Sequence, residues 1–230
     1  MHIILVHGAG GTAYTWSSVL PLLEAHGHAV TVADNFSRSL REDETAVRAL
    51  IEATEGPVLL VGHSYGGAVI SAAGTHERVA GLVYVAAFGP DRDESVQQIV
   101  NRYEPAEVSK YMTRGPAGEW ISSPDEESWQ ELAWDVPEAV RTMAKTEKRV
   151  SGNSIFTQTN IEPAWSSRPS WYLVASSDKH LRPEIQRFMA GRMGATVEEV
   201  DTSHAVPHAA PERVAAIVER ALAVLAPVAT

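Results

Sequence analysis

The motif Gly-His-Ser-Tyr-Gly at residues 62–66 places a serine between two glycines in a G-x-S-x-G pattern. It directly follows a short apolar run, residues 58–61, and opens a small-residue stretch with helical character, residues 64–74. On the sharp turn between a strand and a helix, a serine hydroxyl projects above the sheet and can act as a nucleophile. A five-residue motif can also occur by chance, but the flanking elements argue against that interpretation. We therefore predict that Ser64 is a nucleophile.

A serine hydroxyl is a weak nucleophile at neutral pH, so it needs a base, and the base needs an orienting partner. Asp178 follows the apolar run 171–175 after two serines, and His204 lies in the loop after the run 196–200. Where the nucleophilic serine lies on such a strand–helix turn, the members of the triad follow one another in the chain in the order serine, acid, histidine. The sequence thus predicts a triad of Ser64, His204 and Asp178.

Two other acids remain alternatives for the third member of the triad. Asp91 and Asp93 also follow an apolar run, residues 82–87, that is predicted to be a strand. Some hydrolases of this architecture take the acid from that loop. If Asp178 is not the acid, one of these two is the next candidate.

The remaining histidines offer weaker alternatives for the base or for a metal site. His63 occupies the variable position of the motif and is expected to face away from the nucleophile. His180 lies in a polar loop. His208 follows His204 by four residues, a spacing found in metal sites, but Pro207 and the lack of a third ligand argue against a metal.

A glycine-rich loop, His-Gly-Ala-Gly-Gly at residues 7–11, follows the first apolar run, residues 3–6. Such a loop exposes backbone N–H groups. One of them, together with the N–H of the residue after the nucleophile, can hold an oxyanion. We predict that Ala9 and Tyr65 supply these two donors.

The same loop also matches a loose dinucleotide-binding fingerprint. Gly8, Gly10 and Ala13 fit the spacing, and Asp34 follows a second apolar run about 20 residues further on. The chain has no Tyr-x-x-x-Lys pair of the kind that reductases of this size use, and a cofactor site would leave the predicted triad unexplained. An NAD(P)-binding oxidoreductase is therefore the weaker alternative.

Short apolar runs alternate with helical patterns along most of the chain. Runs without polar alternation indicate strands buried on both faces, as in a parallel sheet covered by helices. We predict an α/β fold with a mostly parallel sheet of about six strands, at residues 3–6, 29–33, 58–61, 82–87, 171–175 and 196–200. Helices are predicted at 14–26, 44–55, 64–74, 183–193 and 211–225.

Residues 89–168 break this rhythm. They lack a convincing buried strand, carry several helical patches and are rich in tryptophan, tyrosine and methionine. We expect a helical cap (lid) inserted into a core domain formed by residues 1–88 and 169–230. Some of the cap aromatics are expected to line a pocket above Ser64, and the others to pack the cap onto the core.

Composition excludes several classes of protein. The formal net charge of the 230 residues is −10, which disfavours nucleic acid as a partner. The chain has no cysteine, so disulfides, thiolate metal sites and a cysteine nucleophile are excluded. No leader and no apolar stretch of membrane-spanning length is visible. We expect a cytoplasmic monomer or homodimer that acts on a small molecule without metal or cofactor.

Together, the glycine-rich loop at 7–11, the 62–66 motif, the run 171–175 with Asp178, and Ser203-His204-Ala205 resemble the α/β-hydrolase superfamily. The nearest resemblance is to small bacterial members related to the plant methylesterase and hydroxynitrile lyase group. The resemblance implies an α/β-hydrolase fold with a Ser-His-Asp triad, nucleophile elbow and oxyanion hole at the residues named above.

Two departures from the hydroxynitrile lyases of this group bear on the chemistry. Those lyases carry a threonine where this chain has Gly8, and a lysine where it has Ala205. Both differences point away from cyanohydrin cleavage. We predict a carboxylesterase-like serine hydrolase that cleaves a small apolar ester through an acyl-enzyme. Lactone or carbon–carbon bond hydrolysis on the same triad, and a non-catalytic ligand receptor, remain alternatives.

Overall fold

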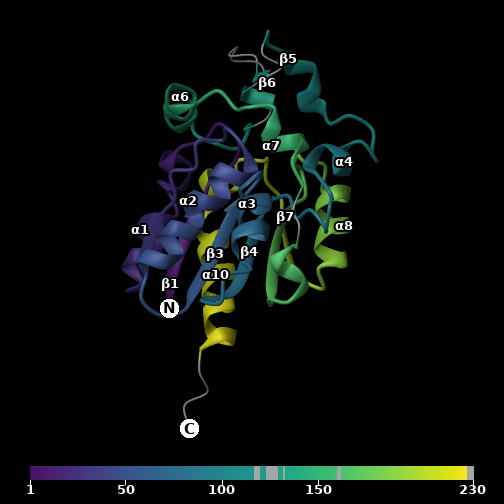
Figure 1. The fold of residues 1–230 in the computed structure, drawn as a ribbon. Helices are drawn as coiled ribbons and strands as arrows, with labels where there is room; N and C mark the ends of the chain where they lie inside the picture. The colour runs from purple at the N-terminus through teal and green to yellow at the C-terminus, as the bar shows by residue number, and fades with distance from the viewer. Residues whose placement is uncertain (117–119, 123–128, 132, 160–161, 227–230) are drawn as a thin grey trace.

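The computed structural model describes residues 1–116, 120–122, 129–131, 133–159 and 162–226. Its centre is a six-stranded, all-parallel sheet with strand order β2-β1-β3-β4-β7-β8 (Figure 1). The strands are β1 (His2–Val6), β2 (Ala29–Val32), β3 (Val58–His63), β4 (Val79–Val85), β7 (Ser170–Ala175) and β8 (Thr196–Val200). The predicted fold class is confirmed, and each predicted strand is found, with β4 beginning three residues earlier than expected.

Helices cover both faces of the sheet because successive strand residues point to opposite sides. Ile4 and Leu60 pack into one buried cluster with α2, α3 and α8, whereas Ile3 and Leu59 pack into a second cluster with α1 and α10. The helix bounds are α1 (Leu20–Ala25), α2 (Leu40–Ala53), α3 (Gly66–Ala73), α8 (Pro183–Arg192) and α10 (Pro211–Leu225). Each fully buried aliphatic side chain contributes about 1.5–3 kcal/mol, so the two clusters hold the sheet rigid beneath the site.

Helices α3 and α8 lie within two residues of their predicted bounds, whereas two other helices differ more. The helix expected at 14–26 is split into a 3₁₀ turn, η1 (Ala13–Trp16), and α1. Pro21 lies in the first turn of α1 and lacks the N–H that a continuous helix would need there. Helix α2 begins four residues earlier than expected because the Ser39 hydroxyl accepts a hydrogen bond from Glu42 N at 3.2 Å and caps the helix.

Most of the described part of segment 89–168 lies beyond the carboxyl ends of the strands, at the top of Figure 1, whereas its last residues, around Ala164, pack against α3 beside the core. The segment holds α4 (Val96–Val100), η2 (Glu107–Tyr111), β5 (Met112–Arg114), β6 (Trp120–Ser122), α6 (Glu138–Glu147), α7 (Ser154–Thr157) and η3 (Ala164–Ser166). The short helices agree with the predicted helical patches. The antiparallel pair of β5 and β6 was not expected, because three-residue strands carry almost no periodic signal.

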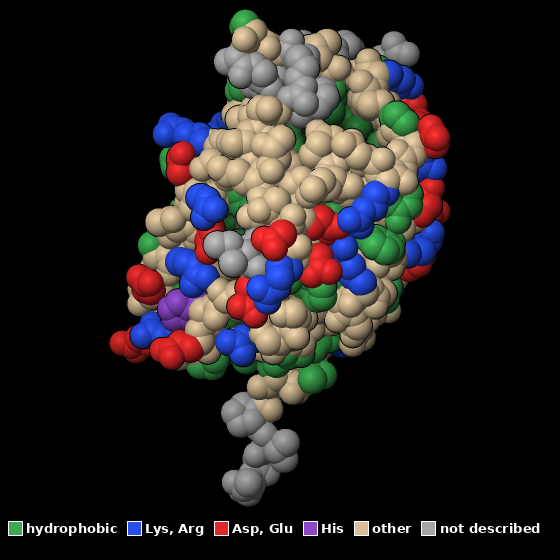
Figure 2. All heavy atoms as spheres, turned by 45° about the vertical axis from the view of Figure 1, so that its right-hand side comes forward, with side chains coloured by type: hydrophobic (Ala, Val, Ile, Leu, Met, Phe, Trp, Pro, Cys, Tyr) green, Lys and Arg blue, Asp and Glu red, His purple; other side chains and the backbone are tan. Residues whose placement is uncertain are grey.

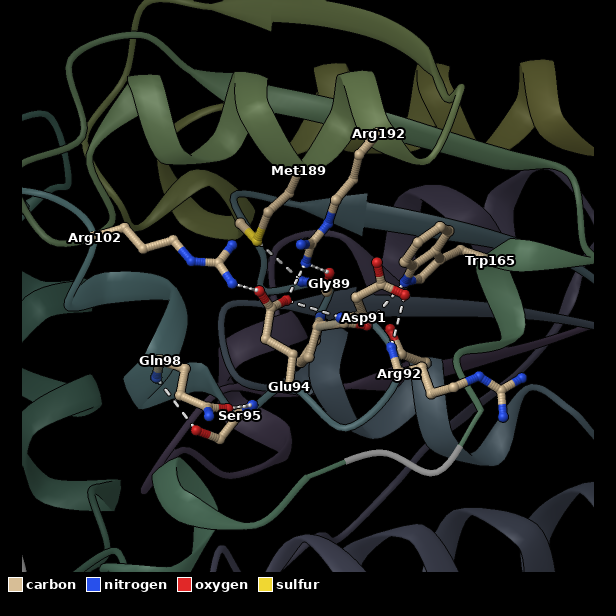
Figure 3. Close-up of polar contacts among 12 residues, drawn as sticks. Gly89, Asp91, Arg92, Glu94, Ser95, Gln98, Arg102, Trp165, Met189 and Arg192 are labelled. Atoms are coloured by element: carbon tan, nitrogen blue, oxygen red, sulfur yellow. Dashed lines mark hydrogen bonds and ion pairs between the residues drawn. The ribbon is translucent and has the colours of Figure 1, made fainter.

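The buried carboxylate of Glu94 links the start of this segment to the core through ion pairs and a hydrogen bond (Figure 3). Glu94 is 6% exposed, and its two oxygens lie 2.5 Å from Arg192 Nη2 on α8 and 2.5 Å from Arg102 Nη2 after α4. Arg192 also donates to the carbonyl oxygen of Gly89, and Glu94 accepts a hydrogen bond from the N–H of Asp91 at 2.9 Å. These contacts join the chain that leaves β4 to a core helix and to the first helix beyond it.

Charged side chains are otherwise spread over the surface. On the face that Figure 2 shows, basic and acidic side chains lie interspersed rather than gathered by sign. Ion pairs on the surface of the chain include Arg187 with Glu199 and Arg182 with Glu184. In the part of the chain that the structure describes, no helix is both long enough and apolar enough to span a membrane.

Candidate active site

Ser64 lies at the turn between β3 and α3, as the motif predicts. Its backbone has φ of +54°, a left-handed conformation that costs a non-glycine residue about 1–3 kcal/mol. The turn is held in place because the Ser64 carbonyl oxygen accepts hydrogen bonds from the N–H groups of Gly67, at 3.0 Å, and Phe88, at 2.9 Å. A Cβ on Gly66 would lie 2.4 Å from the carbonyl oxygen of Val6, so only glycine allows the strand and the turn to approach so closely.

The structure brings His204 and Asp178 together from the loops after β8 and β7. His204 Nδ1 lies 2.7 Å from Asp178 Oδ2, and both side chains are buried. Since an ionised carboxylate only accepts hydrogen bonds, this contact places the proton of a neutral imidazole on Nδ1 and leaves Nε2 as the acceptor. Burial also lowers the pKa of His204, which keeps the ring neutral and able to accept a proton.

Asp178 is held by four hydrogen-bond donors. Its Oδ1 accepts from the N–H groups of His180, at 2.7 Å, and Leu181, at 2.8 Å, and its Oδ2 accepts from Gln186 Nε2, at 2.8 Å, and from His204. Burial raises the pKa of Asp178, while His180 and the backbone donors act in the opposite direction. The carboxylate orientation is therefore determined by the loop backbone and by α8, which carries Gln186.

Ser64 and His204 line the same pocket. Among the described residues, no hydrogen bond joins the Ser64 hydroxyl to the His204 ring. Catalytic hydrogen bonds are often long before substrate binds and tighten in the complex. The structure thus places the three predicted residues at one edge of the sheet, with the acid–base contact formed and the nucleophile–base contact open.

Of the two residues predicted to supply the oxyanion donors, Ala9 lines the pocket and Tyr65 directly follows Ser64 in the chain. The Gly8 backbone lies against Ser64, since a Cβ on Gly8 would be 2.9 Å from Ser64 Cβ. The Tyr65 hydroxyl donates to Asp43 Oδ2 on α2 at 2.9 Å, so the Tyr65 side chain points toward α2. Among the described residues, neither the Ala9 nor the Tyr65 N–H donates a hydrogen bond.

Residues of segment 89–168 supply a largely apolar wall of the pocket. Its lining residues include Val108, Tyr111, Trp129, Ala133 and Ala144, next to the charged Glu147 and Lys148. Of the cap aromatics, Tyr111 and Trp129 therefore line the pocket, whereas Trp134 is 50% exposed and is not part of the lining. The cavity measures about 200 Å³, which suits a small ligand.

Three histidines at the pocket were missed or misplaced by sequence reasoning. His63, expected to face away, lines the pocket and lies 4.9 Å from His204, ring centroid to ring centroid. His180, assigned only to a polar loop, stacks on His204 at 4.4 Å, and His208 lines the pocket beside Ser18. The one sequence signal for these three histidines at the pocket is that each lies within four residues of Ser64, Asp178 or His204.

The alternative acids lie elsewhere. Asp91 Oδ1 accepts a hydrogen bond from the N–H of Arg92 at 2.7 Å, and Asp93 is exposed. Asp34, the acid of the dinucleotide alternative, forms an ion pair with Arg149 at 2.6 Å. Within the described ranges, no hydrogen bond joins any of these three carboxylates to a histidine, and no three His, Asp or Glu side chains are grouped to hold a metal ion.

A parallel α/β sheet with a serine on a left-handed strand–helix turn defines the hydrolase class of this fold. The model of the alpha/beta hydrolase family matches residues 3–217, and the chain belongs to that family. The predicted superfamily is thereby confirmed.

Plant proteins are among the similar sequences. Salicylic acid-binding protein 2 of Nicotiana tabacum is 25% identical over 85% of this chain and 86% of its own length. Methylesterase 8 of Arabidopsis thaliana is 27% identical over 82% of this chain and 76% of its own. Among solved structures, a pyrethroid hydrolase from Sphingobium faniae superposes with a TM-score of 0.85, 26% identity and 96% coverage of both chains.

Proposed function

We propose that this chain is a serine carboxylesterase that cleaves a small, largely apolar ester, with Ser64 as nucleophile, His204 as base and Asp178 as its orienting acid. The observation that carries the proposal is the 2.7 Å contact of His204 Nδ1 with buried Asp178, at a pocket that also contains Ser64. The relatives named methylesterase and pyrethroid hydrolase support an ester as substrate.

The proposed reaction has two steps. His204 Nε2 takes the Ser64 proton as the Ser64 oxygen attacks the ester carbonyl carbon, and the Ala9 and Tyr65 N–H groups stabilise the tetrahedral oxyanion. The intermediate collapses when His204 returns the proton to the departing alkoxide, which leaves an acyl group on Ser64. Water then gives a proton to His204 as its oxygen attacks the acyl carbon. His204 passes that proton to the Ser64 oxygen as the acyl–oxygen bond breaks, which releases the carboxylic acid and regenerates the free serine and the neutral base.

The pocket composition supports a small apolar substrate. Residues of segment 89–168 contribute mainly apolar and aromatic side chains, together with Glu147 and Lys148, while most of the polar groups lie on the core side around the nucleophile. This arrangement suits an ester whose carbonyl meets the glycine-rich loop and whose apolar part packs against the cap. We propose on these grounds that residues 89–168 act as the cap of a core formed by 1–88 and 169–230. The cytoplasmic location and the monomeric or dimeric state stay predictions.

The test is labelling with a fluorophosphonate followed by mass mapping of the modified residue. We expect the label on Ser64, and we expect Ser64→Ala to abolish both labelling and hydrolysis of p-nitrophenyl butyrate while leaving the melting temperature near that of the wild type. Ser167→Ala, a serine outside the pocket, is the matched control and should keep full activity. Unchanged turnover by Ser64→Ala would refute the assignment. Tight binding of an ester without turnover would favour the receptor alternative.

A further inference from the structure

Two histidine rings pack against the ring of His204. His180 lies 4.4 Å from it, ring centroid to ring centroid, with only 11° between the planes, and His63 lies at 4.9 Å with 42° between the planes. Neither residue is needed as an acid or base in the proposed reaction. Their contacts, however, involve the acid and the base, and His63 directly precedes the nucleophile.

His180 contacts both the acid and the base. Its backbone N–H donates to Asp178 Oδ1 at 2.7 Å, while its ring stacks on His204. Burial lowers the pKa of His180 well below its usual value, and the neighbouring His204 acts in the same direction. A neutral ring in this place adds no positive charge to oppose protonation of His204. Among the described residues, the His180 ring makes no hydrogen bond, so its interaction with His204 is the face-to-face contact.

His63 joins the base to the turn that carries the nucleophile. Its Nε2 lies 2.9 Å from the carbonyl oxygen of His204 and, as a carbonyl only accepts, the ring donates this hydrogen bond. Trp16 packs edge to face against the His63 ring, with 6.3 Å between the ring centroids and 84° between the planes. Because His63 directly precedes Ser64, this bond fixes the His204 backbone relative to the nucleophile.

The single hydrogen bond from His204 Nδ1 to Asp178 restrains one atom of the imidazole but leaves the ring plane free to rotate about that bond. The direction in which Nε2 points, and so its distance from the Ser64 hydroxyl, depends on the orientation of that plane. A flat neighbour stacked on one face restricts the rotation, and a bond to the main chain of the same residue restricts its translation. We propose that His180 and His63 are positioning residues that together hold the His204 imidazole in the plane in which Nε2 faces Ser64. This inference rests on the proposed function.

Four variants test the inference: His180→Ala, His180→Phe, His63→Ala and His63→Gln. Phenylalanine keeps a flat ring at position 180 without a titratable group, and the amide of glutamine has a donor as many bonds from Cα as Nε2 of histidine. His26→Ala, on an exposed ring that contacts only Glu219 among the described residues, is the control. We expect each alanine variant to lower kcat about 10- to 100-fold, the usual effect of a misplaced catalytic group, with KM within about twofold of the wild type. His180→Phe and His63→Gln should recover most of the loss.

The readouts separate positioning from other roles. A rise in KM with unchanged kcat would show a substrate contact and overturn the inference, as would equal kcat losses in the alanine and the conservative variants. The low-field NMR signal of the His204 Nδ1 proton should broaden in His180→Ala and return in His180→Phe, and a signal unchanged in both would also overturn it. If His180→Ala does not fold, the kcat values of His180→Phe and His63→Gln relative to the wild type still test the inference.

The same experiment distinguishes failure of this inference from failure of the proposed function. Fluorophosphonate labelling is measured on the wild type and on all variants. A wild type without label at Ser64 would remove the proposed function. A wild type that is labelled, with His180→Ala and His63→Ala labelled at the same rate, would remove the positioning roles alone.

Discussion

Replacing Asp178 by asparagine exchanges one oxygen of the buried carboxylate for an NH₂ group, and the surrounding contacts determine which one. Oδ1 faces two backbone donors, the N–H groups of His180 and Leu181, which cannot turn away. The amide oxygen of the variant must therefore occupy that side. The NH₂ group then occupies the Oδ2 side, where it meets His204 Nδ1 and the amide of Gln186.

This exchange reverses the tautomer of the base. Facing an NH₂ donor, His204 Nδ1 must accept, so its ring proton moves to Nε2 and the ring can no longer take the Ser64 proton. Loss of the correct tautomer in a Ser-His-Asp triad lowers kcat about 10⁴-fold, equal to about 5 kcal/mol of transition-state stabilisation. We expect a loss of this size for Asp178→Asn, with KM little changed.

The assay is the steady-state hydrolysis of p-nitrophenyl butyrate, with thermal melting to count the folded fraction and ¹⁵N NMR of the His204 ring to identify the tautomer. The matched control is Asp201→Asn. Asp201 is an exposed aspartate after strand β8, and it accepts a hydrogen bond from the Ser177 hydroxyl. Wild-type kcat in folded Asp178→Asn would refute the acid assignment. A 10⁴-fold loss in Asp91→Asn instead would move the acid to the loop after β4.

Two further predictions concern stability. Glu94→Gln should lower the free energy of unfolding by about 3 kcal/mol, because it leaves the partly buried Arg192 without its charged partner; urea denaturation measures this. Burial raises the pKa of Glu94, but the Arg192 hydrogen bond, the Asp91 N–H and the charges of Arg192 and Arg102 together outweigh burial, and the folded-state pKa is lowered. The stabilisation is thus present above the ordinary glutamate pKa, near pH 4.3, and disappears as the pH falls through the lowered value. The variant should lose this pH dependence. Gly67→Ala should cost about 3 kcal/mol, since its Cβ would lie 2.3 Å from the Phe88 carbonyl oxygen. Gly191→Ala, with open space in helix α8, should instead gain up to about 1 kcal/mol, and equal melting of the two variants would contradict this reasoning.

Features that depend on neighbours in the chain were predictable. The apolar runs of the six strands, the turn at Ser64 and the glycine-rich loop each lie within a few residues, and each has a local physical requirement. The order of Ser64, Asp178 and His204 relative to the strands followed from the same reasoning, because parallel strands present their carboxyl ends at one edge.

Features that depend on partners far apart in the chain were not predictable in this way. Sequence left Asp178 and Asp91 both open as the acid, and it expected His63 to face away from the site. Helix boundaries such as the break before Pro21 and the early start at Ser39 depend on single capping or proline contacts, which periodicity averages over.

The sequence by itself determined the class of fold and the nucleophile turn, because burial on both faces and a left-handed serine between glycines leave a local pattern. Only the tertiary structure decided that His180 and His63 pack against His204, that Gln186 supports Asp178, and that Tyr111 and Trp129 line the pocket. These contacts join loops and helices separated by many residues. Their geometry follows from how the layers pack around the sheet, and no local periodicity encodes it.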